Sequence, residues 1–312
     1  MRFTVWGSRG SHPTALTPAA VQSKIATVIQ RVRPVDLVSA ESRERFLASL
    51  PAWLFGTTSG NTACVQLELD EDRQIVFDAG TGIINLGHHY LEHPLREVHI
   101  FFTHFHFDHI QGLPFFLSAY DPSVTIHFYS PRDDLETIVR NQMRDPYFPV
   151  TMAGAMTPHL IFHKLDARGI QLYGARLRWR ELNHPGRAFG YRVDYRGKAF
   201  AYVTDVELTG EYFLQNQDNK EFFSGIDAMI LDAQYTLDEA IEKINWGHSS
   251  FSLAVDFAKA WQTKTLYLFH HEPRYSDRKL EQNLQAARQY AAGLQGKDLT
   301  VFLAREGATV DV

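Results

Sequence analysis

Four potential metal ligands lie within six consecutive residues of this 312-residue chain. They are three imidazoles and one carboxylate: His104, His106, Asp108 and His109. Imidazole nitrogens and carboxylate oxygens are the donors that zinc and similar divalent ions prefer in proteins. A histidine-rich surface turn without metal is the alternative, but the flanking residues are apolar. The stretch therefore predicts a metal centre, with His104 and His106 sharing one ion and Asp108 and His109 sharing another.

The elements around this stretch place it beyond the carboxyl end of a strand. Residues 98–102 are apolar and rich in β-branched and aromatic side chains, which predicts a buried strand. Two metal shells require about two more imidazoles and a shared carboxylate, because the stretch cannot fill both alone. His184, Asp205 and His270 each follow a predicted strand and supply them, with the neighbouring His271 as the alternative to His270.

The remaining pattern alternates strands with helices and predicts an α/β protein. Strands are predicted at 2–6, 62–69, 74–77, 98–102, 124–129, 171–182, 189–195, 199–203, 228–231, 265–269 and 299–303, the last of which closes the chain. Helices are predicted around 83–91, 133–143, 237–240, 250–261 and 280–290. Residues 16–56 have apolar side chains at helical spacing and predict a helical insertion, either a lid or a dimer element, in a single domain spanning 1–312.

The amino-acid composition argues against several classes of protein. Its formal net charge of −5 lacks the basic excess that favours nucleic-acid binding. Its single cysteine, Cys64, provides neither a disulfide framework nor a thiolate metal cluster. No run of ~18 apolar residues is present that would span a membrane. We therefore expect a soluble cytoplasmic protein without a membrane partner.

The order of the polar motifs resembles the metallo-β-lactamase superfamily. The motifs are Asp78-Ala79-Gly80, the His-x-His-x-Asp-His stretch at 104–109, and then His184, Asp205 and His270. The resemblance implies an αββα sandwich that spans most of the chain outside the insertion. Within the superfamily the chain resembles a phosphodiesterase branch, which includes phosphoribosyl cyclic phosphodiesterases, class II-like cyclic-nucleotide phosphodiesterases and tRNase Z. Gly60-Asn61-Thr62, Asn183-His184 and Gly247-His248-Ser249 carry that closer resemblance.

The resemblance also implies a role for each ligand. His104, His106 and His184 would hold the first metal, Asp108, His109 and His270 the second, and Asp205 would bridge them. Asp78 would brace the metal loop. The cofactors implied are two divalent ions, Zn2+ in the first place, with Mn2+ or Fe as alternatives because the same donors serve all three.

His248 is the most informative residue outside the ligand set. It precedes a predicted helix, whose amino-terminal N–H groups and dipole attract phosphate, with Ser249 or Ser250 as the cap. In the resembling phosphodiesterases this position is catalytic. We expect His248 to protonate the leaving oxygen or to orient a water that does. Asp205 and Asp108 are expected to hold and orient a metal-bridging hydroxide. Asn61 and Ser249 are the expected substrate-binding residues.

The substrate is expected to be a small or cyclic phosphodiester, such as a cyclic nucleotide or a cyclic ribosyl phosphate. The tRNA-gripping arm of tRNase Z lies between the positions that match His184 and Asp205, where this chain has only a tight meander. Folded RNA is therefore disfavoured, and a homodimer is a further expectation. The alternatives are a lactone or thioester hydrolase of the same fold and a nuclease, followed by a flavodiiron-like redox protein or a non-catalytic sensor.

Overall fold

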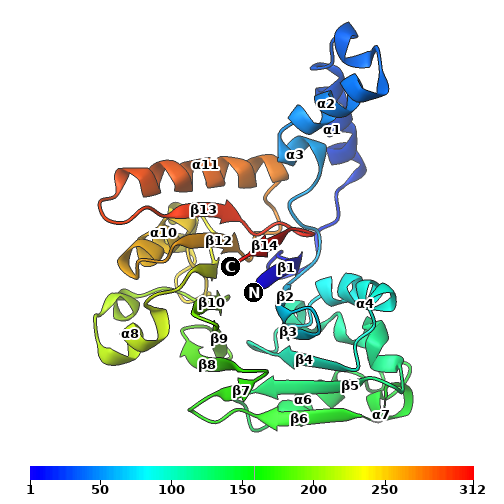
Figure 1. Ribbon diagram of the computed structural model, residues 1–312, viewed down its shortest axis with the longest axis vertical. Helices are drawn as coiled ribbons and strands as arrows, with labels where there is room; N and C mark the ends of the chain where they lie inside the picture. The colour runs from blue at the N-terminus through cyan, green and yellow to red at the C-terminus, as the bar shows by residue number, and fades with distance from the viewer. Residues whose placement is uncertain (158) are drawn as a thin grey trace.

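The computed structural model describes residues 1–157 and 159–312, which form two facing seven-stranded sheets (Figure 1). The first sheet has the order β14-β1-β2-β3-β4-β5-β6, with strands β1 (Arg2–Gly7), β2 (Cys64–Asp70), β3 (Arg73–Phe77), β4 (Glu97–Phe101), β5 (Thr125–Ser130), β6 (Leu160–Lys164) and β14 (Thr309–Asp311). The second has the order β13-β12-β11-β10-β9-β8-β7, with strands β7 (Ile170–Leu172), β8 (Ala175–Leu182), β9 (Ala188–Tyr195), β10 (Lys198–Val203), β11 (Ala228–Asp232), β12 (Thr265–Phe269) and β13 (Thr300–Leu303).

Helices cover the outer faces of both sheets and complete the predicted αββα sandwich, which the structure confirms (Figure 1). The α-helices are α1 (Pro18–Ile29), α2 (Ala40–Ser49), α3 (Ala52–Phe55), α4 (Gly82–Glu92), α5 (Phe107–Ile110), α6 (Leu135–Asn141), α7 (Met152–Ala155), α8 (Gln217–Phe223), α9 (Leu237–Glu242), α10 (Phe251–Ala260) and α11 (Asp277–Gly293). Short 3₁₀ helices occupy η1 (Pro34–Leu37), η2 (Leu113–Phe115), η3 (Leu117–Tyr120) and η4 (Gly210–Phe213). None of the described helices is long and apolar enough to cross a bilayer.

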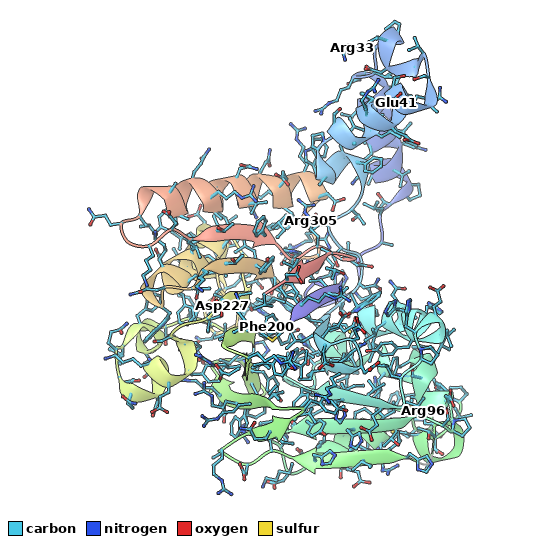
Figure 2. All side chains as sticks on the ribbon, viewed as in Figure 1. Arg33, Glu41, Arg96, Phe200, Asp227 and Arg305 are labelled. Atoms are coloured by element: carbon cyan, nitrogen blue, oxygen red, sulfur yellow. The ribbon has the colours of Figure 1, made fainter. Side chains whose placement is uncertain are left out.

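Aromatic side chains fill the space between the two sheets. Phe200, labelled in Figure 2, lies with its ring centroid 5.3 Å from that of Phe3 and 6.1 Å from that of Phe77. Each of these rings is fully buried, and each contributes apolar area that leaves water on folding. This inter-sheet core holds the strand ends of both sheets at fixed positions.

Three parts of the strand prediction are wrong. Residues 171–182 are not one strand but the hairpin of β7 and β8, because Tyr173 and Gly174 adopt φ values of 55° and 80° that turn the chain. Strand β6 was not predicted, since its five residues show no clean alternation of buried and exposed side chains. The chain closes with the three-residue β14, which follows β13 and pairs with β1.

The segment predicted as a helical insertion forms α1, η1, α2 and α3, and it projects from the sandwich (Figure 1). Helix α1 begins where Thr17 accepts a hydrogen bond from the Ala20 N–H, and it contains no buried residue. Lys24 ties α1 to the body through an ion pair of 2.6 Å with Asp277. Its role as a lid or a dimer element stays a prediction.

Parallel strands bring polar residues from both sheets to one edge of the sandwich. Strands β3, β4 and β5 run parallel in one sheet, and β10, β11 and β12 run parallel in the other. Residues just beyond their carboxyl ends therefore meet. Asp78, His104, Asp205 and His270 all follow such a strand, and Asp232 ends one.

Candidate metal centre

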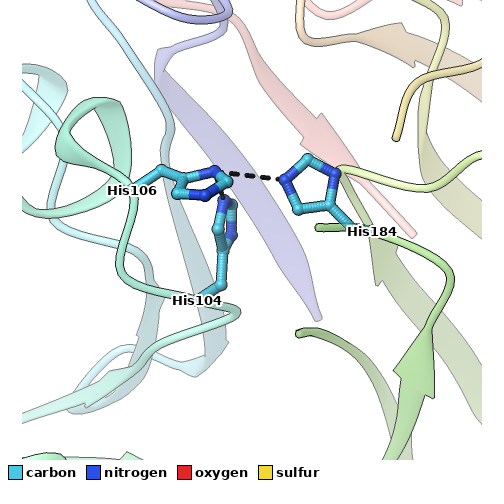
Figure 3. Close-up of side chains that lie close together, drawn as sticks. All are labelled: His104, His106 and His184. Atoms are coloured by element: carbon cyan, nitrogen blue, oxygen red, sulfur yellow. Dashed lines mark hydrogen bonds between the residues drawn. The ribbon is translucent and has the colours of Figure 1, made fainter. Parts of the chain in front are cut away.

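Three imidazoles converge at the edge where the two sheets meet (Figure 3). His106 Nδ1 lies 3.0 Å from His104 Nε2 and 3.1 Å from His184 Nε2. His104 and His106 come from the loop after β4, and His184 comes from the turn after β8. The structure thus brings together the three residues predicted to hold the first metal.

The ring protons of His184 and His104 point away from the point of convergence. His184 donates its Nδ1–H to the Gly247 carbonyl at 2.9 Å. His104 Nδ1 lies 3.1 Å from Thr103 Oγ1, whose own hydroxyl proton goes to Asp78. A neutral imidazole that donates from one nitrogen presents a lone pair on the other. The lone pairs of His104 Nε2 and His184 Nε2 therefore converge beside His106 Nδ1, and three imidazole nitrogens gathered at one point fit a metal ion.

The residues predicted to hold the second metal also lie together. His270 Nε2 is 3.1 Å from Asp108 Oδ2 and 3.4 Å from His109 Nε2. His109 donates its Nδ1–H to Asp78 at 2.8 Å, so its Nε2 faces the group. The neighbouring His271 points elsewhere, with Nε2 3.0 Å from the Ala304 carbonyl oxygen, which resolves the ambiguity between the two histidines in favour of His270.

Asp205 lies between the two groups. Its Oδ1 is 3.2 Å from His109 Nε2, and its Oδ2 is 3.6 Å from His104 Nε2. The carboxylate is almost fully buried, at 1% exposure. A carboxylate that reaches both ligand groups is placed as the predicted bridge requires.

Burial and the two carboxylates set the protonation of the ligands in the absence of metal. Burial lowers the pKa of His104, His106 and His184, so these imidazoles are neutral and able to ligate. Burial also opposes the protonation of His109, but the charges of Asp205 and Asp108 outweigh it and raise the pKa well above its usual value. Metal binding at this site would therefore release protons.

Three residues of the site have left-handed backbone conformations. Asp78, Asp205 and His270 have φ values of 59°, 56° and 59°. Such values are uncommon outside glycine, and they concentrate at functional sites where the surrounding structure imposes them. At each of these strand ends the bend turns a ligand or its partner toward the opposite sheet.

Two glycines lie where the backbone passes so close to a ligand ring that a side chain would not fit. A Cβ at Gly10 would lie 2.5 Å from His270 Nδ1, and one at Gly247 would lie 2.2 Å from His184 Nδ1. Side chains there would displace the rings. The turn at 7–11 thus faces the site as part of its wall, and the Ser11 N–H donates to Asp108 Oδ2 at 2.7 Å.

Asp78 braces the metal loop, as the resemblance implied. It is fully buried, and it accepts hydrogen bonds from the Thr103 N–H, the His109 ring and the Tyr202 hydroxyl. Partners of this kind fix the orientation of a ligand ring and raise its basicity.

His248 lines the site and is oriented by a carboxylate that the sequence analysis missed. Its Nδ1–H donates to Asp232 Oδ2 at 2.7 Å, and its ring stacks on His270 with centroids 4.7 Å apart. Asp232 also accepts from the backbone N–H groups of Val206 and Gln234. Its position at the end of the predicted strand 228–231, like that of Asp205 after its strand, was the available signal.

The two predicted substrate-binding residues have other partners. The Asn61 side-chain amide donates to Glu306, and Glu306 also accepts the backbone N–H groups of Gly60 and Asn61. The buried Ser249 hydroxyl donates to the Val206 carbonyl and accepts from the Leu208 N–H. Neither residue is among the described residues that line the cavity at the ligands, and their substrate-binding roles stay predictions.

The helix after His248 begins at one of the two expected caps. Ser250, not Ser249, caps α10 by accepting the Leu253 N–H, and the Phe251 N–H donates to the Tyr235 carbonyl. These two amino-terminal donors already have protein acceptors, and the expected phosphate contact at this helix end stays a prediction. The His248 imidazole is the group of this segment that faces the cavity.

A cavity of about 360 Å³ opens onto the ligands. It is lined by Ser11, Phe105, His106, Phe107, Asp108, Asp205, His248 and His270. Phe107 is 79% exposed at this wall. The ligands and His248 therefore share one cavity with aromatic side chains.

Comparison with known proteins identifies the family of the chain. The family described as "Beta-lactamase superfamily domain" matches residues 73–271. The ribonuclease Z of Oceanobacillus iheyensis is 23% identical, covering 73% of this chain and 89% of its own length. The ribonuclease Z of Anoxybacillus flavithermus is 25% identical, covering 75% of this chain and 90% of its own length.

Solved structures share the fold over nearly the whole chain. The metallo-β-lactamase fold protein YhfI from Bacillus subtilis superposes with a TM-score of 0.65 at 15% identity, covering 99% of this chain and 98% of its own. The short form of human tRNase Z has a TM-score of 0.61 at 18% identity, covering 100% and 99%. A diphosphatase of the PhnP family has a TM-score of 0.61 at 17% identity, covering 100% and 97%.

Proposed function

The chain belongs to the beta-lactamase superfamily, and from that premise we propose that it is a dinuclear metal-dependent phosphodiesterase acting on a small or cyclic phosphodiester. One observation carries the proposal: two ligand groups joined by Asp205 share a cavity with an imidazole that Asp232 orients. The names of the similar proteins, ribonuclease Z and diphosphatase, denote cleavage at a phosphate group and support this reaction class.

The ligand set fits two divalent ions, with zinc proposed first and manganese or iron as alternatives. His104, His106 and His184 would hold one, Asp108, His109 and His270 the other, and Asp205 both. When bound, such a pair supplies Lewis-acid charge and lowers the pKa of water towards ~7.

The protein's own residues would then position the reacting groups. Asp108 is held by the Ser11 N–H and Asp205 lies between the ligand groups, so their carboxylates can orient a nucleophilic water. Because Asp232 occupies Nδ1 of His248, Nε2 is the nitrogen left to serve the substrate. In its protonated form that nitrogen can give a proton to the leaving oxygen, as a general acid does.

The cavity favours a small substrate that carries an aromatic or apolar group. Phe105 and Phe107 line it beside the ligands, and no lysine or arginine is among its described lining residues. A flat base can stack on an aromatic side chain. Between His184 and Asp205 the chain forms only β9, β10 and short turns, so this part of the fold offers no arm for a folded RNA.

The ribonuclease names of the curated relatives favour a second candidate, a nuclease that acts on RNA. A lactone or thioester hydrolase is the rival within the same fold. The Asp232–His248 pair argues against a thioester, because a leaving thiolate needs a placed proton donor less than the leaving alkoxide of a phosphodiester does.

The test is a panel of substrates assayed with the metal-loaded protein: a 2′,3′-cyclic nucleotide, a cyclic ribosyl phosphate, a precursor tRNA and a lactone. We expect turnover of a cyclic diester that exceeds cleavage of the tRNA. Preferred cleavage of the tRNA would establish the nuclease instead. Turnover of the lactone without any diester cleavage would overturn the proposed reaction class.

A further inference from the structure

A second cavity lies where the projecting segment meets the body of the protein, beside the start of α11 (Figure 1). Its volume is about 530 Å³, and cavities of roughly 300–1,000 Å³ suit small organic ligands. Helices α1 and α3 form one side, and residues 273–278 form the other. None of the described residues that line it also lines the metal cavity, so the two are distinct.

Positive charge dominates the wall of this cavity, although the chain as a whole has a net charge of −5. Five cationic side chains line it: Arg9, Lys24, Arg31, Arg274 and Arg278. Asp277 is the one carboxylate among its described lining residues, and it is already engaged. It pairs with Lys24 at 2.6 Å and accepts the Thr58 N–H at 2.7 Å. The cavity thus offers an excess of positive charge to a ligand.

Arg9, just after β1, is a buried cation that lacks a counter-ion among the described residues. It is only 3% exposed, and its Nε and Nη1 donate to the neutral backbone carbonyls of Ser59, Glu272 and Tyr275. Its Nη2 donates to none of the described residues, and burial lowers the pKa of the guanidinium. A buried charge is costly unless an opposite charge compensates it. An anion in the cavity would therefore stabilise this side chain.

The carboxylates whose charges act on Arg9 from a distance have nearer partners of their own. Besides Asp277 these are Glu272 and Glu306. Glu272 pairs with Arg274 at 2.8 Å, and Glu306 accepts the N–H groups of Gly60 and Asn61. The protein itself thus leaves the charge of Arg9 uncompensated.

Two further guanidinium groups lie beside Trp53 at this cavity. Arg31, after α1, and Arg278, in the first turn of α11, have their Cζ atoms 5.9 Å and 5.8 Å from the centre of the indole ring. The ring attracts such cations and restrains them. Neither arginine forms an ion pair within the described part of the chain, and both are exposed. Their charges are therefore available to a ligand.

We propose that this cavity binds a small organic phosphate with two or more negative charges, at a site separate from the metal centre. Guanidinium groups present forked N–H donors that match the oxygens of a phosphate group. Arg9, Arg31 and Arg278 supply three such groups, and the cavity has room for an organic part beside the phosphate. Because these arginines come from both the body and the projecting segment, the ligand would hold the segment against the body.

The experiment measures binding of 5′-AMP, an organic phosphate that is not a diester, to the metal-loaded full-length protein by isothermal titration calorimetry. We expect Arg31→Gln combined with Arg278→Gln to weaken binding by about 10-fold or more, because charge-assisted hydrogen bonds to phosphate are lost. The matched control is Arg43→Gln combined with Arg45→Gln, which removes the same charge from exposed positions of α2 outside the cavity. It should keep the affinity of the wild type.

Thermal unfolding gives a second readout, because a ligand that binds only the folded state raises its stability. 5′-AMP should raise the melting temperature of the wild type and the control more than that of the Arg31/Arg278 variant. Both readouts follow binding and not turnover, so they do not depend on the proposed reaction. AMP held only at the metal centre would give equal affinities and equal melting shifts in the two double variants. That result, or no binding by the wild type, would overturn the proposal.

Discussion

Among single residues, Asp232 is important because it contacts and orients the ring of His248. It is fully buried, and one of its oxygens lies 2.7 Å from His248 Nδ1. It lies outside the predicted ligand set, so its proposed role is positioning. Carboxylates of this kind fix the tautomer of a histidine and the direction in which its other nitrogen points.

We predict that Asp232→Asn lowers turnover of a cyclic ribose phosphodiester by about 10- to 100-fold and leaves the bound metal unchanged. The loss should shrink for a p-nitrophenyl ester, because p-nitrophenolate leaves without being protonated. His248→Ala should show the same dependence on the leaving group. Asp238→Asn, on the exposed face of α9, is the control. A uniform loss across leaving groups would instead indicate a structural role.

A second prediction for a single residue concerns His271 and the pH dependence of the free energy of unfolding. Its ring is buried at the end of β12, and burial together with the charge of Arg9 lowers its pKa to about 3. The native ring stays neutral while the unfolded ring takes up a proton below about pH 6.5. The free energy of unfolding therefore falls as the pH drops from about 6.5 to about 3.

The variant His271→Gln keeps a donor for the Ala304 carbonyl and removes the titration. Between about pH 6 and about pH 4, the wild type should lose stability faster than the variant by about 1.4 kcal/mol per pH unit. Urea unfolding at several pH values measures both slopes. Parallel slopes would show that His271 does not titrate differently in the folded and unfolded states.

At the scale of elements, strands that feed the site were predictable because their apolar runs are long and buried. Strands β4 and β12 are examples, and each places a ligand just beyond its last residue. The short edge strands β6 and β14 were missed, since both are short and neither contains a buried residue. The hairpin of β7 and β8 was merged into one strand, because its turn depends on left-handed conformations that the residue types do not impose.

The residues of the site also divide into those that the sequence could predict and those that it could not. The ligands could be predicted because residue type and position after a strand both mark them. Asn61 and Ser249 could not be judged in the same way, since the partner of a hydroxyl or an amide depends on distant segments. Glu306 lies 245 residues from Asn61 in the chain, and only the fold brings the two together.

At the scale of the whole molecule, the projecting segment of α1, η1, α2 and α3 remains to be explained. Ile25 and Ile29 share one face of α1 and are 54% and 64% exposed. None of the described residues that line the metal cavity comes from this segment. Exposed apolar residues on a projecting element favour an interface over a lid.

We therefore expect a homodimer in solution that Ile25→Glu combined with Ile29→Glu converts to a monomer, with turnover per chain unchanged. Size-exclusion chromatography with light scattering measures the mass. As a control, Ser23→Glu with Thr27→Glu adds the same charge to more polar positions of α1. A wild type that is monomeric at all concentrations, with turnover that falls in the double variant, would favour a lid.

The central claim is that two ligand groups sharing Asp205 hold the metals on which phosphodiester cleavage depends. The most direct test removes metal from the protein with a chelator, returns Zn2+ stepwise, and follows bound zinc together with turnover of bis(p-nitrophenyl) phosphate. The account predicts no turnover without metal, recovery as the ions of the centre bind, and none in Asp205→Asn. Turnover that survives complete removal of metal would contradict it.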